Sequence, residues 1–160
     1  MWRQRVAVSL LFYLIVSSAA AESCVVATDG LASMHPETVR MKNDDGEEIS
    51  LQVLVADDGF ERASGFQHIC PDVIEDTLIL FRYPREVRGQ FHMQNVHSPL
   101  DIAFMDGDGN VVSVLLMETY SGDHRPLYGP PGAFQYALEA RPGFFQSFGI
   151  SPQASNLLLN

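Results

Sequence analysis

The sequence has few basic residues: Lys and Arg number 10 against 20 Asp and Glu, which gives a formal net charge of −10. Binding to nucleic acid or to an anionic membrane surface depends on clustered Lys and Arg, so this balance argues against both. It also disfavours acidic substrates, and only Arg82, Arg85 and Arg88 offer a local basic patch. The acidity otherwise serves solubility.

Long hydrophobic runs are also scarce, and the clearest one lies near the N-terminus. Arg3 and Arg5 precede the apolar run Val6–Val16, and Ala19–Ala21 offers a small-residue cleavage site. The run is shorter than the roughly 20 residues that cross a bilayer. We expect residues 1–21 to be a signal peptide and the protein to be exported, periplasmic or secreted, with no membrane span after cleavage.

Cysteine is rare, with two residues, Cys24 and Cys70. In an oxidising compartment an even number favours one disulfide, whereas a reactive thiol at Cys70 has no neighbouring motif in its favour. In the chain-entropy model, closing a loop of this length stabilises the fold by about 4 kcal/mol. We predict a disulfide that ties the N-terminal segment to the rest of the domain.

No internal repeat, low-complexity tract or linker divides the chain. We expect an irregular N-terminal segment at 22–37 and a single β domain at 38–160. Short strands separated by turn signals predict a mainly β fold, a compact antiparallel sandwich or barrel of jelly-roll type with one or two short helices. The expected strands are 38–42, 48–56, 77–81, 87–94, 100–106, 111–117 and 133–139. The expected helical segments are 57–65 and 143–148, with a long surface loop at 121–132.

Two of these segments have specific local signals. Residues 48–56 alternate apolar and polar side chains, which is typical of a half-buried strand, and the turn Asn43–Gly46 joins them to the preceding strand as a hairpin. Asp58 followed by Glu61 has the spacing of a capping box, and Gly65 suits the left-handed residue that ends a helix.

The segment from Phe91 to Phe104 is the most informative part of the chain. It places two histidines, an amide pair and a carboxylate between apolar residues that favour strands. Polar groups crowded between core-forming residues are costly to bury, so they are either satisfied internally or used in function.

A calcium site in the 106–110 turn has weak support. Asp106, Asp108 and Asn110 have the alternate spacing that begins a calcium-binding loop. However, Val111 stands where the loop needs glycine, and Met117 stands where a bidentate Glu should close it. A tight hairpin turn explains the same residues.

A copper or zinc site is also disfavoured. The available ligands are His68, His92, His97, His124, Met93 and Met117. On a strand His92 and Met93 point to opposite faces, and the spacing of His92 and His97 across a Ser-Pro turn is not a recognised ligand spacing. Structural roles for the histidines are favoured, and we expect no metal or other cofactor.

Catalytic motifs are few. The chain has no Gly-x-Ser-x-Gly elbow, and a bridged Cys70 leaves no free thiol. The segment Gly129–Gly132 lacks backbone N–H groups at both prolines and cannot cradle phosphate. Asp101 and Glu139 remain as a candidate acid/base pair, although carboxylates beside strands also cap turns by accepting backbone N–H groups.

A family resemblance emerges from the segment described above. The segment resembles the signature of a bacterial and archaeal family called domain of unknown function 192. The matching residues are Phe91-x-Met93-x-Asn95, then 99–102 (Pro-Leu-Asp-Ile) and Phe104. Supporting pieces follow the family order over roughly residues 38–151. They are 55–57, 61–65, 108–109, 111–112, 137–139 and 149–150.

The chain also departs from the family pattern. Residues 92–96 read His-Met-Gln-Asn-Val where the family usually has Trp-Met-Lys-Asn-Thr, and 65–67 read Gly-Phe-Gln in place of Gly-Leu-Met. No role that rests on that lysine or tryptophan carries over. The resemblance implies a compact, mostly β domain that is frequently exported, and it implies no established activity, cofactor or substrate.

We therefore expect a non-catalytic periplasmic binding or accessory module, a monomer that binds a small ligand, a glycan or an envelope protein. The first-choice residues are the polar positions that match the family, Arg62, Asn95, Asp101 and Glu139, with His92 and His97 tuning the site near neutral pH. Alternatively, Asn95 and Asp101 only lock a bend between two strands. The competing hypotheses are a cell-envelope hydrolase with Asp101 and Glu139 as acid and base, and a copper- or zinc-handling protein.

Overall fold

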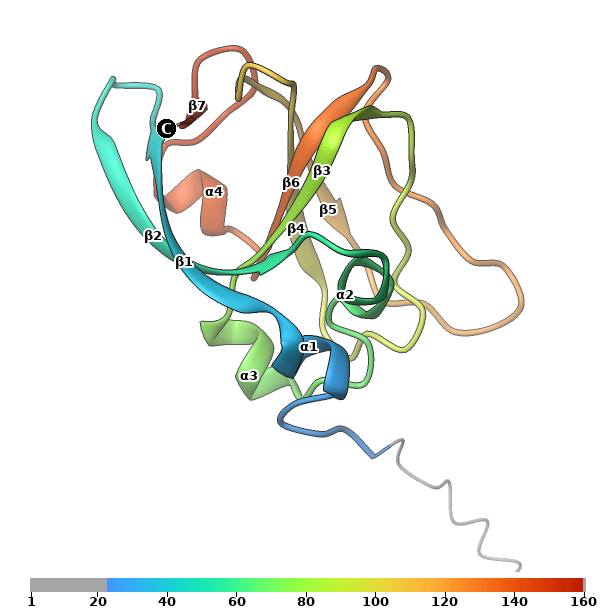
Figure 1. The fold of residues 1–160 in the computed structure, drawn as a ribbon. Helices are drawn as coiled ribbons and strands as arrows, with labels where there is room; N and C mark the ends of the chain where they lie inside the picture. The colour runs from blue at the N-terminus through green and yellow to red at the C-terminus, as the bar shows by residue number, and fades with distance from the viewer. Residues whose placement is uncertain (1–22, 160) are drawn as a thin grey trace, which may run out of the picture.

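The computed structural model describes residues 23–159 (Figure 1). The predicted signal peptide lies outside the described residues, and no helix among those residues is long and apolar enough to cross a membrane. The helices are α1 (Asp29–Ser33), α2 (Gly59–Ser64), α3 (Pro71–Asp76) and α4 (Phe144–Ser147). The strands are β1 (His35–Lys42), β2 (Glu48–Ala56), β3 (Ile79–Val87), β4 (Leu100–Met105), β5 (Val111–Met117), β6 (Phe134–Ala140) and β7 (Asn156–Leu158).

All seven strands belong to one sheet in the order β5-β4-β6-β3-β2-β1-β7. The predicted hairpins β1–β2 and β4–β5 are confirmed. Strands β2 and β3, however, pair in parallel, because α2 and α3 carry the chain back across one end of the sheet. The mainly β, barrel-like fold with short helices is confirmed, with four helices rather than one or two.

The sheet curls into a half-barrel whose two edges meet at one end. The Leu157 N–H of β7 donates to the Gly109 carbonyl at 2.8 Å, and the Val111 N–H of β5 donates to the Ser155 carbonyl at 3.0 Å. Gly109 has φ +86°, and a Cβ built on it would lie 2.3 Å from the Leu157 carbonyl oxygen. Only glycine therefore permits this approach of backbone to backbone.

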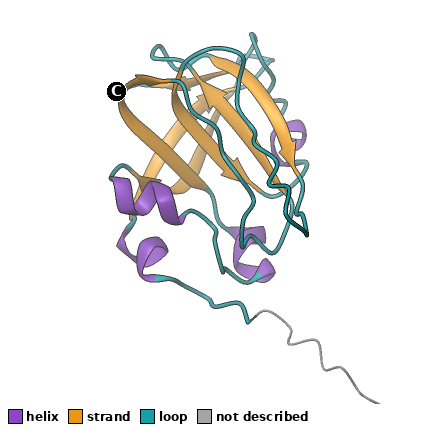
Figure 2. Ribbon diagram, turned by 90° about the vertical axis from the view of Figure 1, so that its right-hand side faces the viewer, coloured by secondary structure: helices purple, strands orange, loops and turns teal. Residues whose placement is uncertain are grey.

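The curled sheet separates two hydrophobic cores. The concave core contains Met41, Leu80, Leu138 and Phe145, and α4 lies within the curl (Figure 1). The outer core lies between the opposite face of the sheet and α1–α3, which gather at one end of the strands (Figure 2). Its largest side chains are Phe66, Phe81, Phe104 and Phe134. Strand β6 contributes to both cores, because successive side chains of a strand point to opposite faces.

The N-terminal segment is more ordered than predicted. Residues 22–37 were expected to be irregular, but they contain α1 and the start of β1. Thr28 caps α1, and its Oγ1 accepts the Leu31 N–H at 3.2 Å. The predicted disulfide is confirmed, since Cys24 is bonded to Cys70. It joins this segment to the N-cap residue of α3, immediately before Pro71.

The prediction of a strand at 87–94 is wrong. Strand β3 continues through Pro84 to Val87, and residues 88–99 form a loop. The register shifts between Arg82 and Val87, so the chain leaves the ladder where Pro84 has no N–H to donate. The strand expected at 77–81 was predicted to end before Pro84, but it continues past this proline. Helix α3, which begins with a proline at its first position, and the short β7 were not predicted.

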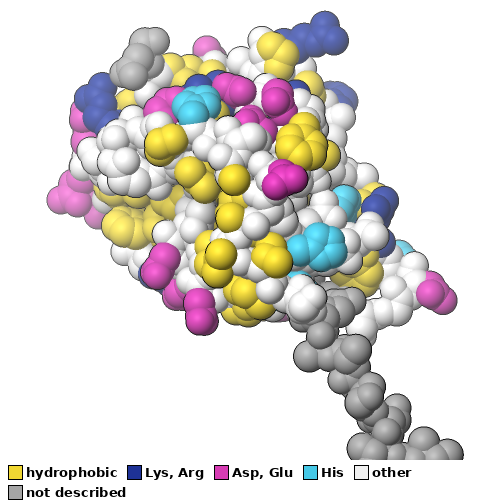
Figure 3. All heavy atoms as spheres, turned by 60° about the horizontal axis from the view of Figure 1, so that its bottom comes forward, with side chains coloured by type: hydrophobic (Ala, Val, Ile, Leu, Met, Phe, Trp, Pro, Cys, Tyr) yellow, Lys and Arg dark blue, Asp and Glu magenta, His cyan; other side chains and the backbone are white. Residues whose placement is uncertain are grey.

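The predicted capping box is present in α2. The Glu61 N–H donates to Asp58 Oδ1 at 2.8 Å, and Glu61 Oε2 accepts the Asp58 N–H at 3.4 Å and also the Asp57 N–H at 3.0 Å. The helix ends at Gly65, whose φ is +47°. At the end of the molecule where α1–α3 lie, apolar side chains are interspersed with acidic ones on the surface (Figure 3).

We predict that closure of the sheet edges depends on Gly109. Both Gly109→Ala and Gly46→Ala place alanine at a positive φ, at a cost of about 1–2 kcal/mol. Nothing lies within 4 Å of a Cβ at Gly46, so only Gly109→Ala also forces β7 away. We expect urea denaturation to show a further loss of about 1–3 kcal/mol for Gly109→Ala. Equal losses in the two variants would contradict the closure.

Candidate functional site

The structure brings together three of the six predicted site residues. Arg62, His92 and Glu139 line one pocket of about 180 Å³ on the outer side of the sheet, here called the Glu139 pocket. Asn95, Asp101 and His97 do not line it. The site is therefore built from α2, β3, β6 and the loop 88–99.

Glu139 lies on β6 between two ladders, paired with Ile79 of β3 and Ile102 of β4. Glu139 is 5% exposed. Among the described residues, no group donates a hydrogen bond to its carboxyl and no cation forms an ion pair with it. Burial alone raises the pKa of Glu139 to about 8 from the usual 4.5. At neutral pH the carboxyl is protonated and offers one O–H donor and one carbonyl acceptor.

Gly65 leaves this carboxyl accessible. A Cβ built on Gly65 would lie 3.9 Å from Glu139 Oε2 and 3.5 Å from the Phe81 ring. The residue ends α2, and its N–H donates to the Glu61 carbonyl at 3.1 Å. The glycine that terminates the helix thus also leaves space beside Glu139, a role that the helix-end signal in the sequence does not reveal.

Arg62 is held firmly at the pocket. Its Nη1 donates to the carbonyls of Asp57 and Arg82, the latter at 3.0 Å, and the guanidinium carbon lies 4.8 Å from the centre of the Tyr83 ring. Burial raises the pKa of Tyr83, an effect that the Arg62 charge opposes and Glu139 reinforces. Tyr83 therefore lies within electrostatic reach of both polar groups of the pocket. Sequence reasoning missed Tyr83, because no motif includes it.

His92 and three aromatic rings complete the walls. Burial lowers the pKa of His92, the Arg125 charge lowers it further, and a backbone hydrogen bond opposes both. The imidazole is therefore neutral at neutral pH. Phe66, Phe81 and Phe91 supply apolar walls, and the Phe81 and Phe91 rings meet edge to face at 4.9 Å.

Asn95 and His97 lie in the loop that borders the pocket. Asn95 has a left-handed backbone with φ 59°, which asparagine tolerates better than most residues. Its carbonyl accepts the His68 N–H at 2.7 Å, and its Nδ2 donates to Gln67 Oε1 at 3.5 Å. His97 Nε2 is buried and has no hydrogen-bond partner in the described part of the chain. Asn95 thus shapes the turn that carries this loop past α2.

Asp101 lies on the other side of the sheet. It pairs with Ala140, whereas Glu139 pairs with Ile102. Because paired residues project to the same face and neighbours in a strand to opposite faces, the Asp101 and Glu139 carboxyls lie on opposite faces. Asp101 Oδ2 accepts the Gly143 N–H at 2.8 Å. Burial raises the pKa of Asp101, and the Gly143 hydrogen bond and the Arg141 charge oppose that shift. The predicted acid/base pair is thus separated by the sheet and cannot act on one bond.

The structure does not support the alternative metal sites. Within residues 23–159, no three His, Cys, Asp or Glu side chains gather as they would around a metal ion. In the 106–110 turn, Asp106 Oδ1 accepts the Asp108 N–H at 3.0 Å and the Asn110 N–H at 2.8 Å. The carboxylate of Asp106 thus stabilises a hairpin turn.

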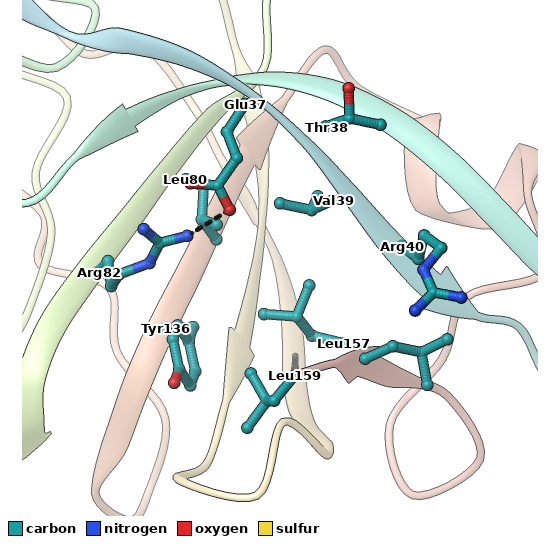
Figure 4. A pocket seen from close by; sticks show the side chains of 10 residues that line it. Glu37, Thr38, Val39, Arg40, Leu80, Arg82, Tyr136, Leu157 and Leu159 are labelled. Atoms are coloured by element: carbon teal, nitrogen blue, oxygen red, sulfur yellow. Dashed lines mark hydrogen bonds and ion pairs between the residues drawn. The ribbon is translucent and has the colours of Figure 1, made fainter.

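A second hollow of about 250 Å³ opens between β1, β3, β6 and the C-terminal residues (Figure 4). Its charged groups are already paired, since Arg82 Nη2 lies 2.7 Å from Glu37 Oε1 and Arg40 Nη1 lies 3.0 Å from Glu48 Oε2. The Arg82 bond contributes most to lowering the pKa of Glu37. None of the predicted site residues lines this hollow, and its paired charges make it a weaker candidate site.

Comparison with known proteins supports the fold. The model of the family domain of unknown function 192, described as an uncharacterized ACR, matches residues 39–155. A solved protein from Sinorhizobium meliloti 1021 that was proposed to be a transcription regulator superposes with a TM-score of 0.67 at 24% identity, covering 79% of this chain and 95% of that one. A protein of unknown function from Novosphingobium aromaticivorans DSM 12444 also gives 0.67, at 20% identity, covering 89% and 99%. No match was found among curated proteins. At these identities the solved structures establish the fold alone.

We predict that Glu139 makes the stability of the protein depend on pH. Its folded pKa, about 8, exceeds the usual 4.5, so between these values the folded state binds the extra proton and stability falls as pH rises. Relative to Glu139→Gln, the wild type should lose about 1.4 kcal/mol of unfolding free energy per pH unit from pH 5 to 8. Urea denaturation at several pH values measures this slope.

The exposed residue Glu118 provides the control for this experiment. Glu118→Gln removes a carboxyl without touching the pocket and should keep the slope of the wild type. If Glu139→Gln also keeps that slope, the Glu139 carboxyl ionises normally in the folded protein and the description of the pocket is incorrect.

Proposed function

The chain belongs to the domain of unknown function 192 family, and we propose that it is a non-catalytic binding module of the cell envelope whose binding site is the Glu139 pocket. One observation carries this proposal. A buried carboxyl without a hydrogen-bond partner in the described chain lies in a pocket together with a firmly held guanidinium.

Hydrogen bonding favours a binding role for these groups. Folded proteins pair nearly all buried polar groups, and the Glu139 carboxyl has no partner among the described residues. Its oxygens are not among the fully enclosed polar atoms, so a molecule that enters the pocket can reach them and supply the missing hydrogen bonds. Arg62 and Glu139 are also two of the positions at which the sequence matches the family pattern.

The size of the pocket limits the ligand. Its volume of about 180 Å³ lies below the range of about 300–1,000 Å³ that holds drug-sized molecules. We infer that a small molecule, or the end group of a larger one such as a glycan, enters the pocket. The aromatic walls suit an apolar stem, while Glu139 and Arg62 suit a polar head.

A binding role fits the geometry better than hydrolysis. A carboxyl with a pKa near 8 is suited to act as a general acid, which is the one feature that favours an enzyme. However, the expected second carboxyl, Asp101, lies on the opposite face of the sheet. The pocket thus lacks the carboxylate pair that the hydrolase hypothesis needs.

Export to the envelope is part of the proposal. The N-terminal sequence has the charged, apolar and small-residue regions of a signal peptide. The Cys24–Cys70 disulfide is typical of proteins in oxidising compartments.

We predict that small polar molecules bind in the Glu139 pocket. Titration of ¹⁵N-labelled protein with a panel of neutral sugars, small carboxylates and small amines should give saturable amide shifts at Gly65, Phe66, Tyr83 and Glu139. Glu139→Gln should change the affinity of a binder at least about tenfold, because it alters a buried hydrogen bond that is worth about 1.4 kcal/mol or more. The Glu118→Gln variant should bind like the wild type. Binders whose shifts map elsewhere, or an unchanged affinity in Glu139→Gln, would refute the proposal.

A further inference from the structure

Arg62 and Glu139 line the same pocket but do not contact each other. Among the described residues, Arg62 forms no ion pair, whereas the ion pairs found there have N–O distances of 2.7 to 3.6 Å. Its hydrogen bonds all come from Nη1 and go to backbone carbonyls. The positive charge of Arg62 is therefore not neutralised by a carboxylate of the described chain, and a gap separates it from Glu139.

Arg62 and Glu139 can both donate hydrogen bonds to the same ligand group. The guanidinium is a donor only, and its remaining N–H groups have no acceptor in the described residues. Protonated Glu139 also offers an O–H donor. A group that satisfies both of these donors must therefore accept a hydrogen bond from each side.

Charge selects among the possible acceptors. An ammonium group would face the like charge of Arg62 at close range, which is unfavourable. A neutral hydroxyl or amide would leave the guanidinium charge unpaired. A carboxylate is acceptor-only, carries the opposite charge to Arg62, and has two oxygens that can serve the two donors separately.

The surroundings suit an organic carboxylate. Arg62 is oriented by the Arg82 carbonyl and stacked on Tyr83, which leaves its planar donor set pre-arranged for an oxygen ligand. Phe66, Phe81 and Phe91 can contact the alkyl or ring part of the ligand.

We propose that the ligand of the Glu139 pocket carries a carboxylate, which binds with one oxygen to the Arg62 guanidinium and the other to the O–H of Glu139. This inference rests on the proposed binding function and specifies its ligand class. It also makes binding depend on a proton that Glu139 keeps.

Three small probes test the inference: propionate, its isosteric amide propionamide, and propylammonium. Propionate should bind in the pocket at pH 7 by the ¹⁵N shifts of Gly65 and Tyr83, and more tightly than the other two. At pH 9.5 its affinity should fall about 30-fold, because only a few per cent of Glu139 with a pKa of about 8 remains protonated. The other titratable groups of the pocket do not account for this loss. Arg62 stays charged, and the shifted pKa values keep His92 and Tyr83 neutral over this range.

Two variants separate the roles of the two donors. Glu139→Gln replaces the O–H by a weaker N–H donor that does not ionise, so propionate should bind more weakly than to the wild type at pH 7, but with the same affinity at pH 7 and pH 9.5. Arg62→Lys removes the planar donor set and should weaken propionate binding at least about tenfold. Arg85→Lys is the matched control at an exposed position and should have no effect.

The outcomes distinguish this inference from the proposed function. If propionamide or propylammonium binds in the pocket and propionate does not, the carboxylate inference is overturned and the binding function stands. If the wild type binds propionate as strongly at pH 9.5 as at pH 7, the proposed hydrogen bond from the O–H of Glu139 to the ligand is overturned. If none of the probes and no member of the wider panel perturbs the pocket, both the inference and the binding function are overturned.

Discussion

Strand β6 lies between β3 and β4 and is covered on both faces, and this constraint determines most of the architecture. Its apolar side chains each enter one of two cores. Leu138 and Ala140 pack into the concave core, while Ala137 and Glu139 face the outer side. A carboxyl at position 139 is therefore removed from bulk water by the sheet itself. Its protonation at neutral pH follows from this burial.

The rest of the pocket is built from irregular positions of the fold. Helix α2 has six residues and is held by its capping box, and it ends at Gly65 beside Glu139. The register of β3 shifts after Arg82, whose carbonyl accepts a hydrogen bond from Arg62. The left-handed turn at Asn95 carries the loop with His92 past α2. Irregular backbone of this kind places polar side chains where regular strands would not.

The sequence predicts local features well because their causes are local. The hairpins, the capping box of Asp58 and Glu61, and the Cys24–Cys70 disulfide all depend on short spacings or simple counting. Residues 88–94 of the loop at 88–99 were predicted as a strand because the conformation of the loop depends on a distant contact, the pairing of Phe91 with Tyr128.

The same reason limits prediction of the site. Arg62 and Glu139 could be selected from the sequence as polar residues at family positions. The sequence could not predict that Asp101 and Glu139 face opposite sides of the sheet, because their relative orientation depends on the register between β4 and β6. A shift of one residue in that register would reverse the faces. Tyr83 and Gly65 complete the pocket through contacts that no motif encodes.

The central claim is that Glu139 is a buried, protonated carboxyl facing a pocket. It is tested most directly by following the side-chain carboxyl ¹³C resonance of Glu139 by NMR as pH is varied, with Glu139→Gln used to assign the signal. A titration midpoint near 8 is predicted. A midpoint near the ordinary value of 4.5 would show that the carboxyl is solvated and ionised at neutral pH, and would contradict the account.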